Sequence, residues 1–292
     1  MQNVTLVAIA AMAVEVIPAV AFAFAAERIA RVVGKWPMVL RVSFPALFVL
    51  PYLIVSLSAH IFQWSWFALY AVLPVAIAGL LMRAARVDPE QRGDWRDAFI
   101  LLVVGLAVDL RWFEGAWPSG LRALNDLFLV DAGLYGFLAI RQLTGTGFDF
   151  HLQWSDWKTG LRELVFFAPV VIVLGIALGF IHPHRNLPAI GGAVLRWILI
   201  FLFTALPEEL FFRGWVQNLL ERRVGRHAAL VIASILFGLS HFNKRSAHFN
   251  WRYVVLATIA GIFYGRGWRK DRRVPASTIT HTSVDWLWGL WF

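Results

Sequence analysis

IFQWSWFALYAVLPVAIAGLLM, residues 61–82, contains no Asp, Glu, Lys or Arg. A second such stretch, VSFPALFVLPYLIVSLSA, occupies residues 42–59. Runs of roughly 18 to 22 uncharged, mostly apolar residues have the length that an α-helix needs to cross the hydrocarbon core of a bilayer. Both runs are continuous rather than alternating, which is typical of membrane helices and not of strands in a membrane barrel. The sequence therefore predicts an all-α fold, a polytopic transmembrane helical bundle.

The composition of the whole chain agrees with this prediction. The 292 residues are 59% hydrophobic and 15% charged, with a mean hydropathy of +0.65, whereas soluble domains are about 25% charged. The chain has no Cys, which excludes a disulfide scaffold, thiolate metal sites and a Cys nucleophile. We expect about 8–10 membrane-spanning helices. The candidate spans are residues 1–26, 42–59, 61–82, 98–110, 121–140, 163–181, 188–212, 228–242, 250–265 and 274–292.

The net charge of +9 has a topological explanation. Lys and Arg accumulate in the cytoplasmic loops of membrane proteins, so the charge does not indicate a nucleic-acid partner. If all ten segments cross, one set of loops holds roughly 19 Lys and Arg, against about 6 in the opposite set. Both termini are then predicted to lie outside, in what we expect to be a bacterial plasma membrane. The basic loops are residues 27–41, 83–97, 141–162, 222–226 and 266–273.

The polar, glycine-containing stretch at residues 144–160 is the best internal boundary. It divides the chain into an N-terminal group of transmembrane helices, residues 1–150, and a C-terminal part, residues 151–292. The N-terminal 150 residues resemble no family, and we expect them to add helices that control substrate access.

The charged groups within the C-terminal spans are candidates for function, because charges inside a membrane are costly. Gly225 belongs to a basic turn; Glu208 lies about 17 residues before it and His241 about 16 residues after it. Helix geometry therefore places both side chains roughly 20–25 Å from that turn. His281 lies about 9 residues beyond the next basic loop, at a comparable depth, and Asp285 is one helical turn further on. We therefore expect Glu208, His241 and His281 to form a cluster inside the bundle.

The two adjacent glutamates have different expected roles. Glu209 and Arg213 have the i,i+4 spacing of a helical ion pair with the acid first, which favours a structural role for both. Glu208 projects about 100° away from Glu209 and is expected to face a cavity. A carboxylate near a histidine suits general-base chemistry. Since no Cys, Ser or Thr is placed as an obvious nucleophile, an activated water is the natural attacking group, and hydrolysis of a peptide bond fits.

Three motifs in this region resemble those of a known family. Residues Glu208 to Arg213 (EELFFR) are similar to EExxxR, residues Phe237 to His241 (FGLSH) to FxxxH, and residues His281 to Asp285 (HTSVD) to HxxxN or HxxxD. In this order, each on a separate apolar segment, they resemble the motifs of the CPBP family. That family is a group of intramembrane proteases that includes type II CAAX prenyl proteases and bacteriocin-processing proteins.

The resemblance implies a glutamate-dependent intramembrane endopeptidase with no metal and no other cofactor. Glu208 and His241 would activate the water, while His281 and Asp285 would stabilise the oxyanion. Three further residues would support the site: Glu209, Arg213 and Phe237, the last packing against His241. The expected substrate is a membrane-anchored or lipidated protein or peptide in contact with the lipid bilayer. Prenylated CAAX-type proteins, bacteriocin precursors and proteins with C-terminal membrane sorting tags all remain open.

Asp285 departs from the amide found in one form of the third motif. An amide can donate a hydrogen bond to an oxyanion, whereas an ionised carboxylate only accepts. Either Asp285 is protonated, or it orients His281, which then donates. We favour the second interpretation.

Two other functions are compatible with the sequence. His241, His281 and Glu208 could be zinc ligands of a membrane metalloprotease, although the chain lacks the HExxH motif. The chain could also be a non-catalytic scaffold or a transporter, although it shows no paired repeats of the kind common in transporters.

Overall fold

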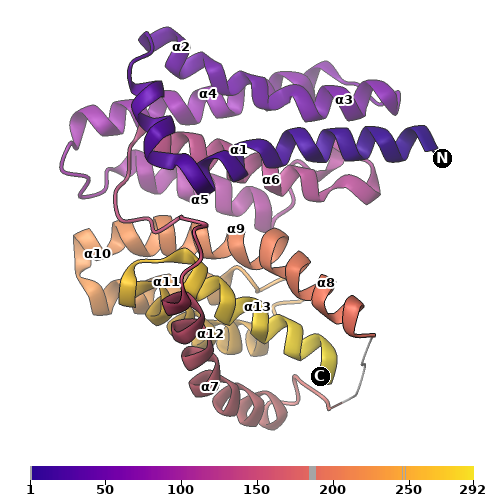
Figure 1. Cartoon of the computed structure of the whole chain (residues 1–292), viewed down its shortest axis with the longest axis vertical. Helices are drawn as coiled ribbons and strands as arrows, with labels where there is room; N and C mark the ends of the chain where they lie inside the picture. Colours follow the sequence, from indigo (N-terminus) through magenta and orange to yellow (C-terminus); the bar gives the residue numbers. More distant parts are fainter. Residues whose placement is uncertain (1, 184–188, 245, 247) are drawn as a thin grey trace. The chain divides into compact units, whose positions relative to one another are not determined.

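The computed structural model describes residues 2–183, 189–244, 246 and 248–292. Every regular element in these residues is helical, and the part of the chain so described contains no strand. The chain divides into two compact units, Met1–Thr144 and Gly145–Phe292. In Figure 1 the first unit runs from indigo to magenta and the second from dark red to yellow. The predicted all-α fold is confirmed.

The N-terminal unit is built from helices joined by short turns. Its buried aromatic side chains are linked by hydrogen bonds: the Tyr70 hydroxyl donates to Asn125 Oδ1 at 2.8 Å and accepts from Trp117 Nε1 at 2.6 Å. The elements are α1 (Gln2–Gly34), α2 (Met38–Ser43), η1 (Phe44–Val49), α3 (Leu50–Ser58), α4 (Trp64–Val87), α5 (Trp95–Asp109), η2 (Glu114–Ala116), η3 (Ser119–Leu121), α6 (Ala123–Leu134) and the π-helical segment η4 (Tyr135–Ile140).

The C-terminal unit contains the three motif segments. Gly225 lies in the basic turn between the helices Asn218–Val224 and Arg226–Leu239. Its φ of +79° is a backbone conformation that favours glycine. The elements are α7 (Trp154–Ala177), α8 (Ile190–Ile200), η5 (Phe201–Ala205), α9 (Leu206–Glu209), η6 (Leu210–Gln217), α10 (Asn218–Val224), α11 (Arg226–Leu239), α12 (Trp251–Asp271) and α13 (Val274–Trp291).

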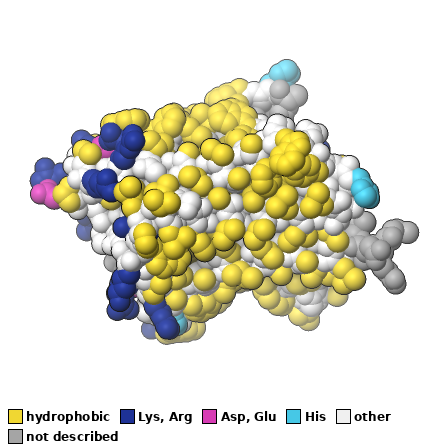
Figure 2. Space-filling model, turned by 90° about the horizontal axis from the view of Figure 1, so that it is seen from above, with side chains coloured by type: hydrophobic (Ala, Val, Ile, Leu, Met, Phe, Trp, Pro, Cys, Tyr) yellow, Lys and Arg dark blue, Asp and Glu magenta, His cyan; other side chains and the backbone are white. Residues whose placement is uncertain are grey.

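Six helical stretches of the described residues are long and apolar enough to cross a membrane, fewer than the eight to ten expected. Within the described residues, every expected span nevertheless falls on helical segments. Four of the expected spans are not among the six stretches: α5 and α11 are short, α12 carries several basic residues, and α13 contains many polar residues. In Figure 2, hydrophobic side chains cover much of the visible face, while Lys and Arg gather at one end. The six stretches are Leu6–Gly34, Met38–Ser58, Trp64–Val87, Ser119–Ile140, Trp154–Ala177 and Ile190–Val224.

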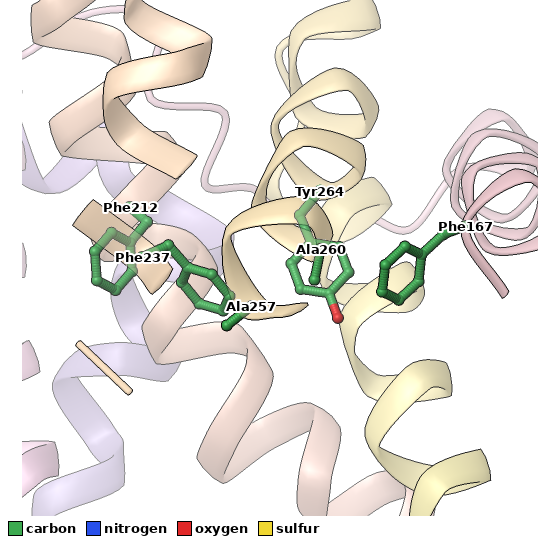
Figure 3. Close-up of a cluster of buried hydrophobic side chains, with 6 residues drawn as sticks. All are labelled: Phe167, Phe212, Phe237, Ala257, Ala260 and Tyr264. Carbon is green, nitrogen blue, oxygen red and sulfur yellow. The ribbon is translucent and has the colours of Figure 1, made fainter. Parts of the chain in front are cut away.

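A row of aromatic side chains forms the core of the C-terminal unit beside the motif segments (Figure 3). Phe212 meets Phe237 edge to face at a centroid distance of 5.1 Å, and Phe237 meets Tyr264 at 5.8 Å. Tyr264 in turn meets Phe167 of α7 at 6.1 Å. Edge-to-face pairs add to the stabilisation that burial of the rings provides. This row joins α7, η6, α11 and α12, and thereby fixes the elements that carry the first two motifs.

Helices α11 and α12 approach closely because small residues line their interface. A Cβ atom at Gly261 would lie 2.9 Å from Ser234 Cα, so no larger residue fits without a shift. A Cβ atom at Gly238 would similarly lie 2.6 Å from the Val254 carbonyl oxygen. The close approach brings the end of α11, where the second motif ends, against the aromatic side chains of α12.

Candidate active site

The acidic motif lies on a short α-helical turn between two π-helical segments. Glu208 and Glu209 end α9, with η5 before them and η6 after them. Pro207 has no backbone N–H, so it cannot donate the hydrogen bond of a regular helix at this point. Wide π-helical turns commonly occur at functional sites, where they redirect side chains. The two adjacent carboxylates point in different directions, Glu209 toward Arg213 and Glu208 toward Lys244.

Glu209 is completely buried and binds two partners through a single oxygen. Its Oε1 lies 3.2 Å from Arg213 Nη1 and 2.9 Å from His281 Nδ1. Arg213 is also buried, donates from Nη2 to the Gly261 carbonyl oxygen at 3.1 Å, and lies 4.6 Å from the centre of the Phe237 ring. The ion pair expected from the i,i+4 spacing is present. Glu209 additionally holds a histidine of the third motif.

His281 has carboxylates at both ring nitrogens. Nδ1 faces Glu209, while Nε2 lies 3.6 Å from Asp285 Oδ2 and 4.0 Å from Glu208 Oε2. Carboxylates accept hydrogen bonds, and only the doubly protonated imidazolium ring has a donor on both nitrogens. The arrangement therefore suits a positively charged His281 that can donate from Nε2.

Two rings fix the plane of His281. Tyr264 stacks on it with a centroid distance of 4.6 Å and an interplanar angle of 16°. Phe237 meets it at 5.6 Å and 90°. With Nδ1 bonded to Glu209, the imidazole has little freedom to rotate, and Nε2 keeps its direction toward Glu208 and Asp285.

His241 has a different hydrogen-bond arrangement. Its Nδ1 lies 2.8 Å from the Phe237 carbonyl oxygen, which can only accept, so Nδ1 carries the proton. Nε2 of the neutral ring then holds a lone pair. The ring packs against Phe237 at 4.8 Å, as expected, and against Tyr253 at 4.7 Å. The two histidines thus have opposite capacities: His241 can accept a proton and His281 can donate one.

A cavity of about 110 Å³ lies against the two histidines. His241, His281 and Asp285 form the polar part of its lining, and the remainder is mostly apolar or aromatic. Its aromatic walls include Phe180, Tyr253 and Trp288, which contact one another: Tyr253 meets Trp288 at 5.6 Å, and Phe180 meets Trp288 at 5.4 Å.

Glu208 does not line this cavity. Its Oε1 instead lies 3.6 Å from Lys244 Nζ, and its side chain is 26% exposed. Glu208 therefore points toward the segment after α11. Glu208 remains beside the histidines through its contact with His281.

The structure therefore brings the residues of the three motifs into one cluster, and it adds three residues that the sequence analysis missed. Tyr264 and Tyr253 are aromatic residues in an ordinary apolar run, so only the packing of α12 identifies them. Lys244 follows the second motif by three residues, and this closeness in sequence was the available signal. Among the described residues, no group of three or more His, Cys, Asp or Glu side chains is arranged to hold a metal ion.

Comparison with known proteins identifies one family. Residues 190–287 match the family model described as type II CAAX prenyl endopeptidase Rce1-like, which confirms the resemblance stated from the motifs. The matched segment contains all three motifs and excludes the N-terminal unit. No curated protein and no solved structure matches the chain. Together, the match and the apolar helices indicate a multi-pass integral membrane protein in which residues 190–287 are similar to type II CAAX prenyl endopeptidases.

Proposed function

Because residues 190–287 match the Rce1-like CAAX prenyl endopeptidases, we propose that this protein is an intramembrane endopeptidase that hydrolyses its substrate with a water activated by Glu208 and His241. The observation that carries the proposal is the convergence at His281 Nε2, where Glu208 Oε2 lies at 4.0 Å and Asp285 Oδ2 at 3.6 Å. Residues of the first and third motifs thereby meet, and His241 of the second motif lines the same cavity as His281.

The proposed reaction begins with the water. Its oxygen forms a bond to the scissile carbonyl carbon while one of its protons passes to the Glu208 carboxylate. The lone pair on His241 Nε2 accepts a hydrogen bond from the same water and orients it. The carbonyl electron pair moves onto oxygen, giving a tetrahedral oxyanion. When the C–N bond breaks, the proton on Glu208 passes to the leaving amine, which restores the carboxylate.

His281 is the proposed oxyanion donor. A positively charged ring whose orientation is set in advance by Tyr264 and Glu209 stabilises developing negative charge without reorganisation. Asp285 Oδ2 lies 3.6 Å from the same nitrogen, too far for a hydrogen bond, so Nε2–H stays available to the oxyanion, and we assign Asp285 the role of orienting the charged ring by its negative charge. An ionised Asp285 cannot donate to an oxyanion, which supports this choice.

The cavity supports a lipid-bearing substrate. Its walls between the histidines and Trp288 are apolar and aromatic, a lining suited to a hydrocarbon chain. A CAAX sequence carries an isoprenoid on its Cys, followed by three residues. We propose that the isoprenoid occupies the cavity and that the peptide bond after the lipidated Cys lies at His241 and His281.

A purified-enzyme assay tests this function. The probe is a peptide ending in S-farnesyl-Cys and three further residues, with the unlipidated peptide for comparison and a metal chelator in the buffer. The wild-type protein should cleave the lipidated peptide after Cys, and Glu208→Gln should lower kcat by about 10²–10⁴-fold. Glu90→Gln, which alters an exposed glutamate of the N-terminal unit, is the control and should retain activity. Equal activity of Glu208→Gln and wild type would contradict the proposal, and loss of activity on chelation would favour the zinc alternative.

A further inference from the structure

Lys244 is a cation whose position beside the candidate site is set by the backbone. Its N–H donates to the His241 carbonyl oxygen at 3.2 Å, and its own carbonyl oxygen accepts from Asn250 Nδ2 at 3.1 Å. Asn250 also donates from its backbone N–H to Phe242 and caps α12 by accepting from the Tyr253 N–H. Hydrogen bonds to both the N–H and the carbonyl oxygen of Lys244 therefore hold its backbone in place after the second motif.

The ammonium group of Lys244 is accessible, unlike the other cation of the cluster. Its side chain is 37% exposed, whereas that of Arg213 is 1% exposed. Its partner Glu208 is the proposed base, at 3.6 Å. At 3.6 Å the contact is too long for a hydrogen bond, so a substrate carboxylate that approaches Lys244 more closely can take the place of Glu208.

The distance from Lys244 to the reacting centre matches a short peptide. One carboxylate connects the two, because Glu208 Oε1 contacts Lys244 and Glu208 Oε2 lies 4.0 Å from His281 Nε2. Lys244 Nζ therefore lies within about 10 Å of His281 Nε2, a length that three extended residues span at about 3.3–3.6 Å each. Lys244 contacts Glu208, and neither residue lines the apolar cavity. The two histidines do line it.

We propose that Lys244 binds the C-terminal carboxylate of the substrate and so selects peptide bonds three residues from a free C-terminus. This inference rests on the proposed function, in which the lipid fills the cavity and three residues follow the scissile bond. When the substrate binds, its carboxylate takes the place of Glu208 as the partner of Lys244, and Glu208 is left to act on the water. The apolar cavity and the ammonium group then recognise opposite sides of the same bond.

The test compares two probes that differ only at the C-terminus: the S-farnesyl peptide with a free carboxylate and the same peptide with a C-terminal amide. The wild-type protein should prefer the carboxylate by about tenfold or more in kcat/KM, the value of one charge-assisted hydrogen bond. In Lys244→Met this preference should be lost, so that the two peptides have equal kcat/KM, whereas Lys244→Arg should retain most of the preference. Lys158→Met, which removes an exposed lysine from α7, is the matched control and should keep the full preference.

The remaining outcomes overturn the inference. If Lys244→Met slows both peptides by the same factor, Lys244 acts only on Glu208 and not on the substrate. If it keeps the full carboxylate preference, another group binds the C-terminus. If vesicles rich in anionic lipid inhibit the wild type but not Lys244→Met, with equal cleavage of both peptides, a lipid headgroup is the occupant. A wild-type protein that cleaves neither peptide contradicts the proposed function itself, and the inference with it.

Discussion

The most informative single residue in the third motif is Asp285. Its carboxylate lies 3.6 Å from His281 Nε2, at the nitrogen that we propose donates to the oxyanion. If Asp285 orients and stabilises the charged ring, its negative charge is required. If it were a protonated donor, an amide would replace it well.

Asp285→Asn separates these two roles. We expect this variant to lower kcat by about tenfold, because the imidazolium ring loses the negative charge beside it, with little change in KM. Steady-state kinetics on the lipidated peptide provide the measurement. Retained or increased activity would show that the carboxylate is not needed and would favour the donor role.

Candidate residues could be identified from the sequence where the motifs are short and lie on separate helices. Glu208, His241 and His281 could be placed at similar depths by counting residues from the turn at Gly225 and from the basic loop before α13. The direction of Glu208 could not be predicted, because its partner Lys244 is placed by the turn after α11, which no local pattern encodes. The stacking of Tyr264 depends on α12 packing, which no local pattern encodes.

At the scale of the helices, the α11–α12 interface controls the site. His241 follows α11, and Tyr264, which stacks on His281, belongs to α12. Any separation of the two helices must therefore change the relation between the histidines. Such interfaces with close backbone approach are common between helices in membranes.

Gly261→Ala tests this dependence. The added methyl group would lie 2.9 Å from Ser234 Cα, so the helices must shift, at a cost of about 1–3 kcal/mol in the free energy of unfolding. We expect a lower thermal midpoint in detergent together with reduced kcat. Gly267→Ala on the same helix is the control, since its nearest neighbour would be 3.7 Å away. Equal effects of the two substitutions would contradict the account.

The turn after α4 provides a pH-dependent contact outside the membrane spans. Burial raises the pKa of Asp88, but hydrogen bonds from the Arg92 and Gly93 amides and from Arg141 outweigh it and lower the pKa below its usual 3.8. The folded state thus favours the ionised carboxylate. This stabilisation is fully present above the unfolded-state pKa and is lost as pH falls below about 4 through the folded-state value.

Asp88→Asn should therefore remove part of the acid sensitivity of the N-terminal unit. Thermal unfolding of the full-length protein in detergent, measured between pH 3 and pH 7, gives the comparison. The variant should be less stable than wild type at pH 7, and the difference should shrink as the pH falls below about 4. A difference independent of pH would show that Asp88 does not contribute through its charge.

At the scale of the whole molecule, the basic loops predict the orientation in the membrane. The absence of Cys makes the prediction accessible to labelling, since an introduced Cys is the only reactive thiol. His60→Cys lies in the turn between α3 and α4, and Arg92→Cys in the turn between α4 and α5; both positions are exposed.

We expect His60→Cys to react with a membrane-impermeant thiol reagent in intact cells and Arg92→Cys to react only after permeabilisation. Mass-tag shifts on a gel measure both. The reverse labelling pattern would place both termini on the cytoplasmic side. The soluble part of the substrate would then approach the site from the opposite side of the membrane.

The polar stretch at residues 144–160 predicts a division of the chain into residues 1–150 and 151–292, and the two compact units of the structure are Met1–Thr144 and Gly145–Phe292. A functional difference between the parts, with substrate access controlled by residues 1–150, stays a prediction. The number of membrane-spanning helices was harder to predict. Whether a short helix or a helix with charged ends crosses the membrane depends on the helices packed against it, and a hydropathy pattern does not contain that information.

Proteolysis that depends on Glu208 can be measured in cells by comparing the termini of membrane proteins when the wild-type protein, Glu208→Ala or Glu90→Gln is present at equal abundance. We predict that a set of shortened C-termini, each ending at a lipidated Cys, is present with wild type and Glu90→Gln and is lost with Glu208→Ala. An identical set of termini in all three cell lines would contradict the account.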